Sequence, residues 1–598
     1  MNIRNVAIIA HVDHGKTTLV DRLLQYTAVD ARTKIAERAL DSNELERERG
    51  ITILSKTTAV EYQGCRINIV DTPGHADFGG EVERIMSMVD SVLLLVDAVE
   101  GPMPQTRFVT EKSFAAGLNP ILVVNKIDRV GAEPHRVVDA VFDLFDSLGA
   151  NESQLDFPVA FTSATEGIAG DDPDNMAADM APLLDLIVAR VPPPQVDAVG
   201  PFQMQVSTLD YSTYVGVIGI GRVVRGSMLP RGNVVVVNAD GTTRKGRVLS
   251  FMASRGLERV ELDEAQAGDI VCVTGLDALG ISDTICDPAR VEALPELLVD
   301  EPTLTMMFRV NTSPLAGNEG KFVTSRQIKD RLEREASHNV ALRVDQTADP
   351  DQFLVSGRGE LHLSVLIETM RREGYELAVS RPEVIMRECD GVMTEPFENA
   401  IFDIEQAHQG KVMEALGERR AELVDMENDG SGRVRLTYKV ATRALMGFRT
   451  EFISYTSGLG IMTFASAGYG ELVNGLTTGR VNGVLVANGP GRSVAYALFN
   501  LQNRGRMMVG PGVEIYEGMV IGIHSRGNDL TVNPMKEKKL TNIRAAGSDE
   551  NVLLASPIEL SLEQSLEFIN DDELVEITPK SIRIHKKWLK AHERKRAS

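Results

Sequence analysis

Five apolar runs, each rich in β-branched residues, recur through the first 165 residues of the chain. They read NVAIIA (5–10), CRINIV (65–70), SVLLLVD (91–97), NPILVVN (119–125) and FPVAFTS (157–163). The runs are continuously apolar, and the stretches between them are long enough to form helices. This pattern predicts parallel strands that are buried on both faces of one sheet. Ligands of such sheets bind beyond the carboxyl ends of the strands, so the residues that follow each run are candidates for a site.

The hydrophobic pattern changes after a proline-rich break, ARVPPPQVDAVGPF, at residues 189–202. Short apolar runs then alternate with glycine-rich turns up to about residue 298, which is typical of a small β-barrel. From residue 302 strands mix with amphipathic helices in two successive segments, and each segment predicts a split βαβ sandwich. From about residue 480 short apolar runs with frequent glycine favour a mostly β domain.

Composition narrows the class of protein. The chain has 598 residues and a formal net charge of −22, which argues against a general nucleic-acid coat. Its four cysteines, Cys65, Cys272, Cys286 and Cys389, show no C-x-x-C spacing, so neither a zinc site nor a disulfide framework is indicated. This usage fits a reducing cytoplasm. The amino-terminal residues contain no signal-peptide core and no apolar run reaches the roughly 18 residues that span a bilayer, so we expect no export and no membrane insertion.

The first run leads into AHVDHGKT, residues 10–17, which has the pattern of a phosphate-binding loop. Backbone N–H groups of such a loop surround a phosphate, Lys16 can reach its outer oxygens, and Thr17 can place a hydroxyl on Mg²⁺. The candidate nucleotide-binding residues here are Asp13, His14, Gly15, Lys16, Thr17 and Thr18. Because the loop opens with Ala10 where glycine is usual, this stretch alone leaves open a chance Gly-Lys-Thr at a helix start.

The second run ends in DTPGH, residues 71–75. Asp71 can hold the metal through water, and Gly74 offers a backbone N–H that can approach a γ-phosphate closely. Between the two motifs, LERERGITI (45–53) is charged and then β-like, and its Thr52 can add a hydroxyl to the metal when a γ-phosphate is present. Taken alone, DTPGH is an ordinary turn and LERERGITI a charged loop that leads into a strand.

The fourth run ends in NKID, residues 125–128, which selects the base of the nucleotide. The Asp128 carboxylate offers only acceptors, and guanine presents two adjacent donors at N1–H and the 2-amino group. Adenine lacks that amino group, so the same carboxylate would be left unpaired, at a cost of orders of magnitude in affinity. Asn125 can tie the base motif to the phosphate loop, and Lys126 can cover the ring face. Ser163 and Ala164 can offer backbone N–H groups to the guanine carbonyl.

With these elements in order, residues 1 to about 190 resemble the GTP-binding domain of the translational GTPases, at AHVDHGKTT, RGITI, DTPGH and NKID. The resemblance implies that His75 is the catalytic histidine, which positions the attacking water. It also implies that Val12 and Ile51 form an apolar gate beside His75, and that Asp13 helps to neutralise charge near the phosphates. No arginine finger can be assigned from this stretch. The family property of faster hydrolysis on ribosomes is therefore expected here.

Two basic segments stand out near the carboxyl terminus of an acidic chain, NPMKEKKLTNIRAAG and HKKWLKAHERKRAS. Basic residues on a loop or tail can neutralise RNA phosphates, and the single tryptophan can stack on a base. The candidate RNA-contacting residues are Lys536, Lys538, Lys539, Arg544, Lys586 and Lys587. A solvated charged loop and terminus are the alternative for both segments.

Later segments resemble the second, third and fifth domains of the elongation factor G class. Only about fifteen residues, 381–395, stand where that translocase carries an additional domain. The carboxyl-terminal motifs VNPMKEKKLTNIRAAGSDE and TPKSIRIHKKWL resemble a family of bacterial ribosome-associated GTPases. An elongation factor 4-like back-translocating GTPase is the first alternative, and a non-enzymatic ribosome binder switched by GTP is the second.

We therefore predict a multidomain fold with an α/β P-loop GTPase domain, a β-barrel domain, two α+β ferredoxin-like domains and a mostly β carboxyl-terminal domain. The predicted boundaries are 1–195, 200–298, 302–382, 394–478 and 479–598. The resemblance implies GTP or GDP with Mg²⁺ as cofactors. It also implies a cytoplasmic monomer that acts on the 70S ribosome and the 50S subunit through rRNA and tRNA. Roles in stress or cold adaptation and in large-subunit assembly follow from the same resemblance.

Overall fold

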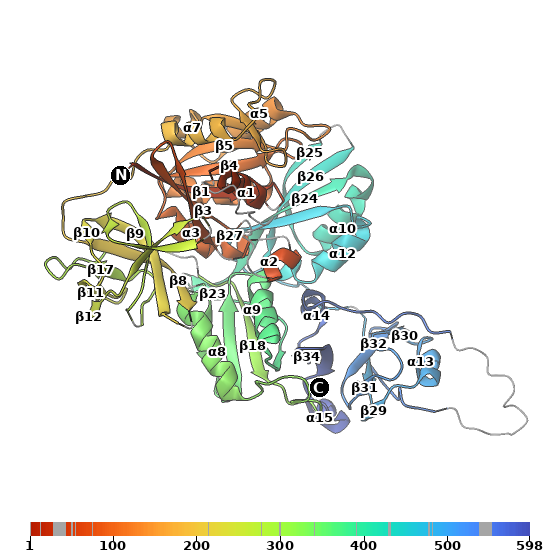
Figure 1. Ribbon diagram of the computed structural model, residues 1–598. Helices are drawn as coiled ribbons and strands as arrows, with labels where there is room; N and C mark the ends of the chain where they lie inside the picture. The colour runs from red at the N-terminus through yellow and green to blue at the C-terminus, as the bar shows by residue number, and fades with distance from the viewer. Residues whose placement is uncertain are drawn as a thin grey trace, which may run out of the picture. The chain divides into compact units, whose positions relative to one another are not determined.

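The computed structural model contains two compact units (Figure 1). One comprises residues 1–300 with 337–341 and 463–465, and the other comprises 301–336, 342–462 and 466–598. Within these units the structure describes residues 2–11, 13–27, 44–49, 52–53, 55–73, 76–212, 214–256, 258–276, 278–297, 301–339, 341–389, 391–428, 432–476, 479–480, 482–537 and 553–597. None of the helices in these ranges combines the length and the apolar character that a membrane span requires.

The first unit begins with a seven-stranded sheet in the order β2-β3-β1-β4-β5-β6-β7. The strands are β1 (Asn2–Ala10), β2 (Lys56–Tyr62), β3 (Cys65–Asp71), β4 (Ser91–Asp97), β5 (Asn119–Asn125), β6 (Val159–Ser163) and β7 (Ile168–Gly170). The five strands expected from the apolar runs are all present and parallel. The edge strands β2 and β7 are antiparallel and were not predicted as part of this sheet.

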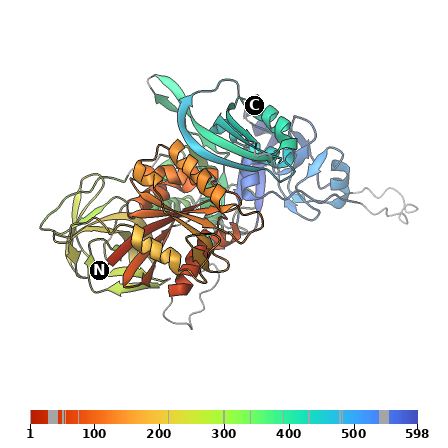
Figure 2. The same ribbon diagram turned by 90° about the horizontal axis from the view of Figure 1, so that it is seen from above.

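Continuous apolar strands give this sheet a core on each face. In β1, Val6 and Ile8 pack into one cluster while Ala7 and Ile9 pack into the other. Helices α1 (Lys16–Thr27) and α7 (Ala181–Arg190) cover the first face, and α3 (Gly79–Met86), α4 (Pro104–Ala115) and α5 (Pro134–Ser147) cover the second (Figure 2). The short helices are α2 (Glu44–Arg49), η1 (Ala76–Phe78) and α6 (Glu152–Leu155). The charged part of LERERGITI is therefore largely helical, and the strand that follows begins only at Lys56.

An eight-stranded antiparallel sheet follows, in the order β12-β11-β17-β8-β9-β16-β13-β14. Its strands are β8 (Gln203–Ser212), β9 (Gly216–Arg225), β11 (Asn233–Val237), β12 (Thr243–Arg247), β13 (Phe251–Arg255), β14 (Glu258–Leu262), β16 (Ile270–Val273) and β17 (Thr284–Cys286). A separate pair is formed by β10 (Ser227–Met228) and β15 (Ala265–Gln266). The sheet encloses one core that includes Phe202, Val206 and Phe251. This arrangement agrees with the predicted β-barrel domain.

The second unit contains two α+β sheets with the same strand order. The first consists of β18 (Leu304–Val310), α8 (Ser325–His338), β19 (Arg343–Gln346), β20 (Gln352–Gly357), α9 (Glu360–Glu373) and β21 (Leu377–Val379). The second consists of β24 (Val392–Glu405), η2 (Gln406–His408), α10 (Gln409–Glu418), β25 (Glu422–Asn428), β26 (Arg433–Ala441), α11 (Thr442–Leu445), α12 (Phe448–Tyr455) and β27 (Ile461–Glu471). In both, the third strand lies between the second and the first, and the fourth pairs with the other side of the first. This is the ferredoxin-like order, so two predicted sandwiches are present. Only β22 (Glu383–Val384) and β23 (Arg387–Cys389) lie between them.

The carboxyl-terminal segment contributes strands to three sheets. One has the order β30-β32-β28-β33, formed by β28 (Val484–Ala487), β30 (Gly505–Met507), β32 (Val520–His524) and β33 (Leu530–Val532). A second small pair is β29 (Gly491–Arg492) with β31 (Glu514–Ile515). The remaining elements are helices α13 (Ala495–Leu501), α14 (Leu562–Phe568) and α15 (Ala591–Ala597) and strands β34 (Glu573–Ile577) and β35 (Ile582–Lys586).

Strand β34 pairs with β21, so β34 and β35 extend the sheet of the first ferredoxin-like domain. This sheet therefore crosses the predicted boundary at 479, which assigns residues 573–586 to the carboxyl-terminal domain. Buried apolar residues explain the addition, since Val575 and Ile577 pack in one core with Phe308 and Leu377.

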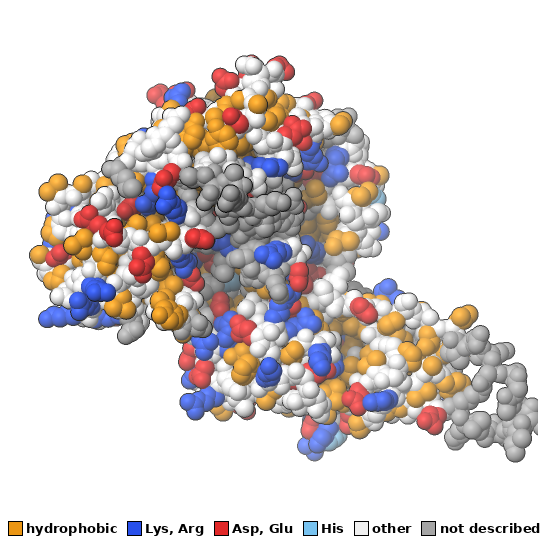
Figure 3. All heavy atoms as spheres, viewed as in Figure 1, with side chains coloured by type: hydrophobic (Ala, Val, Ile, Leu, Met, Phe, Trp, Pro, Cys, Tyr) orange, Lys and Arg blue, Asp and Glu red, His pale blue; other side chains and the backbone are white. Residues whose placement is uncertain are grey.

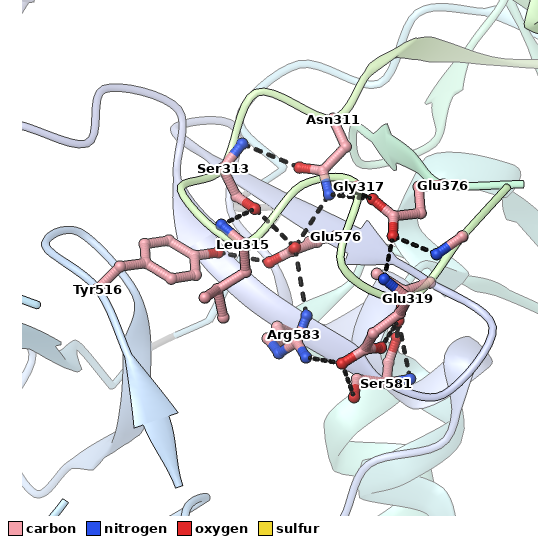
Figure 4. Close-up of polar contacts among 12 residues, drawn as sticks. Asn311, Ser313, Leu315, Gly317, Glu319, Glu376, Tyr516, Glu576, Ser581 and Arg583 are labelled. Atoms are coloured by element: carbon pink, nitrogen blue, oxygen red, sulfur yellow. Dashed lines mark hydrogen bonds and ion pairs between the residues drawn. The ribbon is translucent and has the colours of Figure 1, made fainter. Parts of the chain in front are cut away.

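A buried carboxylate also ties β34 to its neighbours (Figure 4). Glu576 is fully buried and accepts hydrogen bonds from Asn311 Nδ2 at 3.0 Å and Ser313 Oγ at 2.7 Å. It also accepts one from Tyr516 OH at 2.6 Å, and Arg583 Nη1 lies 3.3 Å away. Burial and then the Glu576 charge raise the pKa of Tyr516, so the phenol stays a donor. Four donors offset the cost of burying this charge, and they come from segments far apart in the sequence.

Candidate functional site

The phosphate loop lies between β1 and α1. Asp13 and Gly15 both have positive φ values, 64° and 96°, and α1 begins at Lys16. A Cβ on Gly15 would lie 2.5 Å from Asn125 Nδ2, so only glycine fits where the loop meets the base motif. Ala10 ends β1 as a buried core residue without a positive φ. Its methyl group therefore faces no strain, and the absence of glycine at this position is no defect.

Lys16 is held at the carboxyl end of β3. Its Nζ lies 3.1 Å from Asp71 Oδ1 and also donates to the carbonyl oxygen of Thr72. Thr52 Oγ1 lies 3.5 Å from Asp71 Oδ2, which brings the predicted metal ligands of two motifs together. Burial raises the pKa of Asp71, and the Lys16 charge opposes that rise. The Lys16 ammonium group thus lies beside the Asp71 carboxylate, where a metal ion would also be attracted.

The oxygen donors of this edge suit Mg²⁺. Asp71 and Thr52 are buried and adjacent, and the Thr17 hydroxyl, at the start of α1, makes no hydrogen bond with a described residue. Hard oxygen ligands of this kind are those that Mg²⁺ prefers, together with substrate phosphates and water. Among the described residues no group of three or more His, Cys, Asp or Glu side chains could hold a metal ion. The residues present therefore fit a magnesium ion that is bound jointly with a nucleotide.

Asn125 connects three parts of the site. Its Nδ2 donates to the carbonyl oxygen of His14 at 2.9 Å, which fixes the base motif to the phosphate loop. Its Oδ1 accepts from Thr162 Oγ1 at 3.1 Å and from the Ala164 N–H at 3.0 Å. The predicted tie between the two motifs is therefore present. The Ala164 N–H is engaged by Asn125, so a contact with a guanine carbonyl would have to share this donor.

The turn after β5 presents Asp128 to solvent, with the Arg129 N–H donating to the Lys126 carbonyl at 3.1 Å. Lys126 has a positive φ of 62°, and its Nζ lies 2.9 Å from Asp97 Oδ2. Arg129 Nη1 lies 2.8 Å from the same oxygen. A buried carboxylate on β4 thus anchors both flanks of the exposed Asp128.

Asp97 and Arg129 were not predicted from the sequence. Burial alone would raise the pKa of Asp97. Hydrogen bonds from Lys126 and the Val99 N–H lower it by more, so the pKa lies below its ordinary value. A signal was available, because Asp97 ends a predicted strand at the same sheet edge as Asp71 and Asn125. Its partners Lys126 and Arg129 could not be inferred from the sequence, because they lie in the turn after a different strand, β5.

The other predicted residues differ in what they offer. The His14 ring is fully buried against β4, with Nδ1 accepting from the Asp97 N–H at 3.3 Å. The ring is thus not available to a phosphate. Ser163 is buried, with its hydroxyl 3.3 Å from Thr165 Oγ1, and Thr18 is partly buried on α1. Val12, Ile51, Gly74, His75, Lys538, Lys539 and Arg544 lie outside the described residues, so their roles stay predictions.

Three predicted RNA contacts lie within the described residues. Lys536 and Lys587 are exposed, as an RNA contact requires. Lys586 is not, because only 3% of its side chain is exposed and its Nζ lies 2.5 Å from Asp529 Oδ2, 2.7 Å from Asp572 Oδ2 and 2.9 Å from Glu573 Oε1. Burial alone would lower the pKa of Lys586, but these carboxylates raise it above its ordinary value. The structure corrects the expectation for Lys586, whose charge is used inside the fold.

Replacing Lys586 with Ala is therefore expected to destabilise the second unit by about 3 kcal/mol, the lower end for removing one partner of a buried ion pair. The expected loss of stability is at the low end because the Asp529 and Asp572 side chains are 41% and 61% exposed, so water can solvate them in the variant. Glu573 would still have Arg480 as an ion-pair partner at 2.9 Å. Lys587→Ala is the matched control, and it should change stability by less than about 0.5 kcal/mol because the side chain is exposed. Thermal unfolding of both full-length variants checks this. Equal shifts for the two would contradict the assigned role of Lys586.

Four protein-family models match successive parts of this chain. The model for the elongation factor Tu GTP binding domain matches residues 1–193, and the model for elongation factor Tu domain 2 matches residues 216–286. The elongation factor G C-terminus matches residues 392–476, and the TypA/BipA C-terminal domain matches residues 482–591. A solved structure from Thermus thermophilus shares the fold, with a TM-score of 0.55 at 16% identity, covering 79% of this chain and 98% of that one.

The base motif, the phosphate loop and these domain matches define a GTPase of the translation-factor class. Two curated relatives named large ribosomal subunit assembly factor BipA match over the full length. The protein from Salmonella typhimurium is 62% identical, and the match covers 100% of this chain and 98% of that protein. The protein from Haemophilus influenzae is 60% identical, and the match covers 100% of this chain and 97% of that protein. The chain belongs to the TypA/BipA family. The elongation factor 4-like alternative is not supported, because the carboxyl-terminal match is to this family.

Proposed function

We propose that this protein hydrolyses GTP to GDP and phosphate at the factor-binding site of the ribosome, and that it acts in assembly of the large ribosomal subunit. The relatives at 62% and 60% identity, named for that assembly role, support the process. The observation that carries the GTP assignment is the bridge by Asn125, which joins the phosphate loop to the loop of Ala164 beside the exposed Asp128.

The residues divide the work along the edge of the sheet. Lys16 supplies a positive charge for the outer phosphate oxygens, and Asp128 pairs with the two adjacent donors of guanine. Thr17, Thr52 and Asp71 would hold Mg²⁺, Asp71 through water. When bound, this ion offsets the charge that develops on the phosphate oxygens. By resemblance to the family, His75 orients the attacking water, and Val12 with Ile51 restricts its access until the ribosome rearranges the site.

The proposed partners are the 70S ribosome and the 50S subunit, contacted through rRNA and tRNA. Exposed Lys536 and Lys587 are suited to phosphate contacts, because a cation that is free of internal partners can replace counterions on RNA. We place the protein in the cytoplasm as a monomer, with roles in stress or cold adaptation. The domain matches and the names of the relatives support the ribosomal part of this proposal.

Measuring GTP turnover by the purified full-length chain with and without 70S ribosomes tests the proposal. We expect ribosomes to raise turnover by about 10³-fold, the lower end for a transition-state group that is supplied by a partner. A Lys16→Ala variant is measured in parallel, as a control for GTPases that contaminate the ribosomes. This variant lacks the cation that contacts the phosphates, so it should show no ribosome-stimulated turnover. A turnover rate that does not change on adding ribosomes would refute the proposal.

A further inference from the structure

The carboxyl-terminal domain carries three arginines whose charges the fold does not use. Arg504 and Arg506 lie at β30, and Arg526 follows β32. All three are exposed, and none of them forms an ion pair or a side-chain hydrogen bond with any residue that the structure describes. By contrast, Arg480 and Arg583 of the same unit are held by carboxylates at 2.9 Å and 2.6 Å. We call Arg504, Arg506 and Arg526 the arginine patch.

The strand register brings the patch together. Arg506 pairs with Ile523 in the antiparallel ladder of β30 and β32, and the Ser525 N–H donates to the Arg504 carbonyl at 2.9 Å. Arg504 and Arg506 are two positions apart, so they lie on one face of the strand, and Met507 on the other face is buried. Arg526 follows Ser525, the residue opposite Arg504. All three arginines thus stand at the same end of a single ladder.

An exposed aromatic ring lies directly before the patch in the chain. Phe499 is 44% exposed on α13, which leads through a short turn into β30. Asn503 in that turn is also exposed. A phenylalanine ring that remains in water forgoes the free energy of burial, and an aromatic face beside cations is the combination that binds an unstacked base.

Basic residues slightly outnumber acidic residues in the segment that carries the patch. Residues 482–537 contain five Lys or Arg and four Asp or Glu, in a chain whose net charge is −22. Two of these acids are already engaged, because Asp529 pairs with Lys586 and Glu514 lies 3.8 Å from Arg492. Charges of both signs are otherwise interspersed on the face of the molecule in Figure 3.

We propose that Phe499, Arg504, Arg506 and Arg526 form a binding site for single-stranded RNA. In this site the guanidinium groups bind successive phosphates, and one unpaired base stacks on Phe499. The inference rests on the proposed ribosomal function, which provides the RNA. Described residues on both sides of 538–552 contact the two ends of α13, because the Val494 N–H donates to the Pro534 carbonyl at 3.0 Å and the Ala555 N–H donates to Gln502 Oε1 at 2.8 Å. Lys538 and Lys539, two of the predicted RNA-contacting residues, follow Glu537 in the sequence.

The test measures binding of the full-length protein to a fluorescent 12-nucleotide single-stranded RNA over a range of salt concentrations. In the double variant Arg504→Gln/Arg506→Gln, two phosphate contacts are lost, so the slope of log K against log salt should fall by about 1.4. Phe499→Ala should weaken binding about 5- to 100-fold, while Phe499→Tyr, which keeps a stacking face, should stay close to the unmodified protein.

The control double variant Arg231→Gln/Arg449→Gln removes the same charge from two exposed arginines outside the patch, and its slope should not change. Thermal unfolding and GTP binding of every variant show whether the fold and the nucleotide site are intact. A wild type that does not bind the RNA, or an arginine variant with an unchanged slope, would overturn the proposal.

Photocrosslinking from position 499 on ribosomes gives a second readout. Crosslinks to RNA are expected, and crosslinks only to ribosomal protein would also overturn the assignment. The outcomes separate the two proposals. A protein with arginine-dependent RNA binding but no ribosome-stimulated GTP turnover contradicts the proposed function alone. Normal stimulation with an unchanged salt slope contradicts the RNA site alone.

Discussion

Replacing Asp128 with Asn is expected to lower the affinity for GTP by about 10²- to 10⁴-fold, or roughly 3–6 kcal/mol. The Asp128 carboxylate accepts from guanine N1–H and from the 2-amino group, and the Asn amide can accept only one of these. Its own N–H₂ group would then face a guanine donor and remain unpaired. Xanthine carries a carbonyl in place of the 2-amino group, so the same amide pairs with it at both positions. The variant should therefore prefer xanthosine triphosphate.

Equilibrium titrations with fluorescent GTP and xanthosine triphosphate analogues measure this exchange. Asp139→Asn is the matched control, because Asp139 is an exposed carboxylate on α5, outside the predicted nucleotide motifs. Its affinity for GTP should not change. If Asp128→Asn lost GTP without gaining xanthosine triphosphate, the base contact assigned to Asp128 would be wrong, and general damage to the turn held by Asp97 would explain the loss.

Replacing His75 with Ala is expected to lower ribosome-stimulated GTP hydrolysis by about 10²- to 10⁴-fold, the range for a side chain that handles a proton or orients water in the transition state. GTP affinity should stay within about threefold, because the proposed role of His75 is made only with the attacking water and is absent in the ground state. The reduction should therefore appear in kcat and leave Kd almost unaffected.

Single-turnover hydrolysis on 70S ribosomes, with a separate measurement of GTP affinity, checks this expectation. His135→Ala, which removes an exposed histidine from α5, controls for loss of a histidine in the same domain. The His75→Ala variant also distinguishes a requirement for GTP hydrolysis from a requirement for GTP binding alone. If His75→Ala lost turnover but still supported large-subunit assembly in cells, GTP binding without hydrolysis would be sufficient, and the non-enzymatic alternative would be favoured over the proposed function.

Much of the nucleotide site could be predicted from the sequence because its chemistry is local. Lys16, Asp71 and Asn125 each follow a continuous apolar strand, and parallel strands bring their carboxyl ends to one edge. The structure places Lys16 3.1 Å from Asp71 and joins Asn125 to the phosphate loop at 2.9 Å. Asp97 escaped prediction although it ends such a strand, because its role depends on Lys126 and Arg129 from the turn after the neighbouring strand.

The carboxyl-terminal region shows what a linear pattern leaves open. Lys586 and Lys587 are adjacent and chemically identical, and the sequence proposed the same RNA contact for both. The structure buries one against Asp529, Asp572 and Glu573 and exposes the other. Lys586 is the last residue of β35 and pairs with Glu573 of β34, whereas Lys587 follows the end of the strand. The pairing of β34 with β35 therefore decides which of the two lysines meets the buried carboxylate.

The sequence by itself determined the class of nucleotide, the order of the domains and the strand ends that carry the chemistry. These depend on residue type and on periodicity over a few residues. Only the tertiary structure decided that β34 and β35 complete the sheet begun by β18 and that Glu576 accepts hydrogen bonds from distant segments. It also decided that three arginines at the ends of β30 and β32 have no side-chain partner among the described residues. The physical reason is that burial and charge pairing depend on contacts between residues far apart in the chain, and these exist only once the chain has folded.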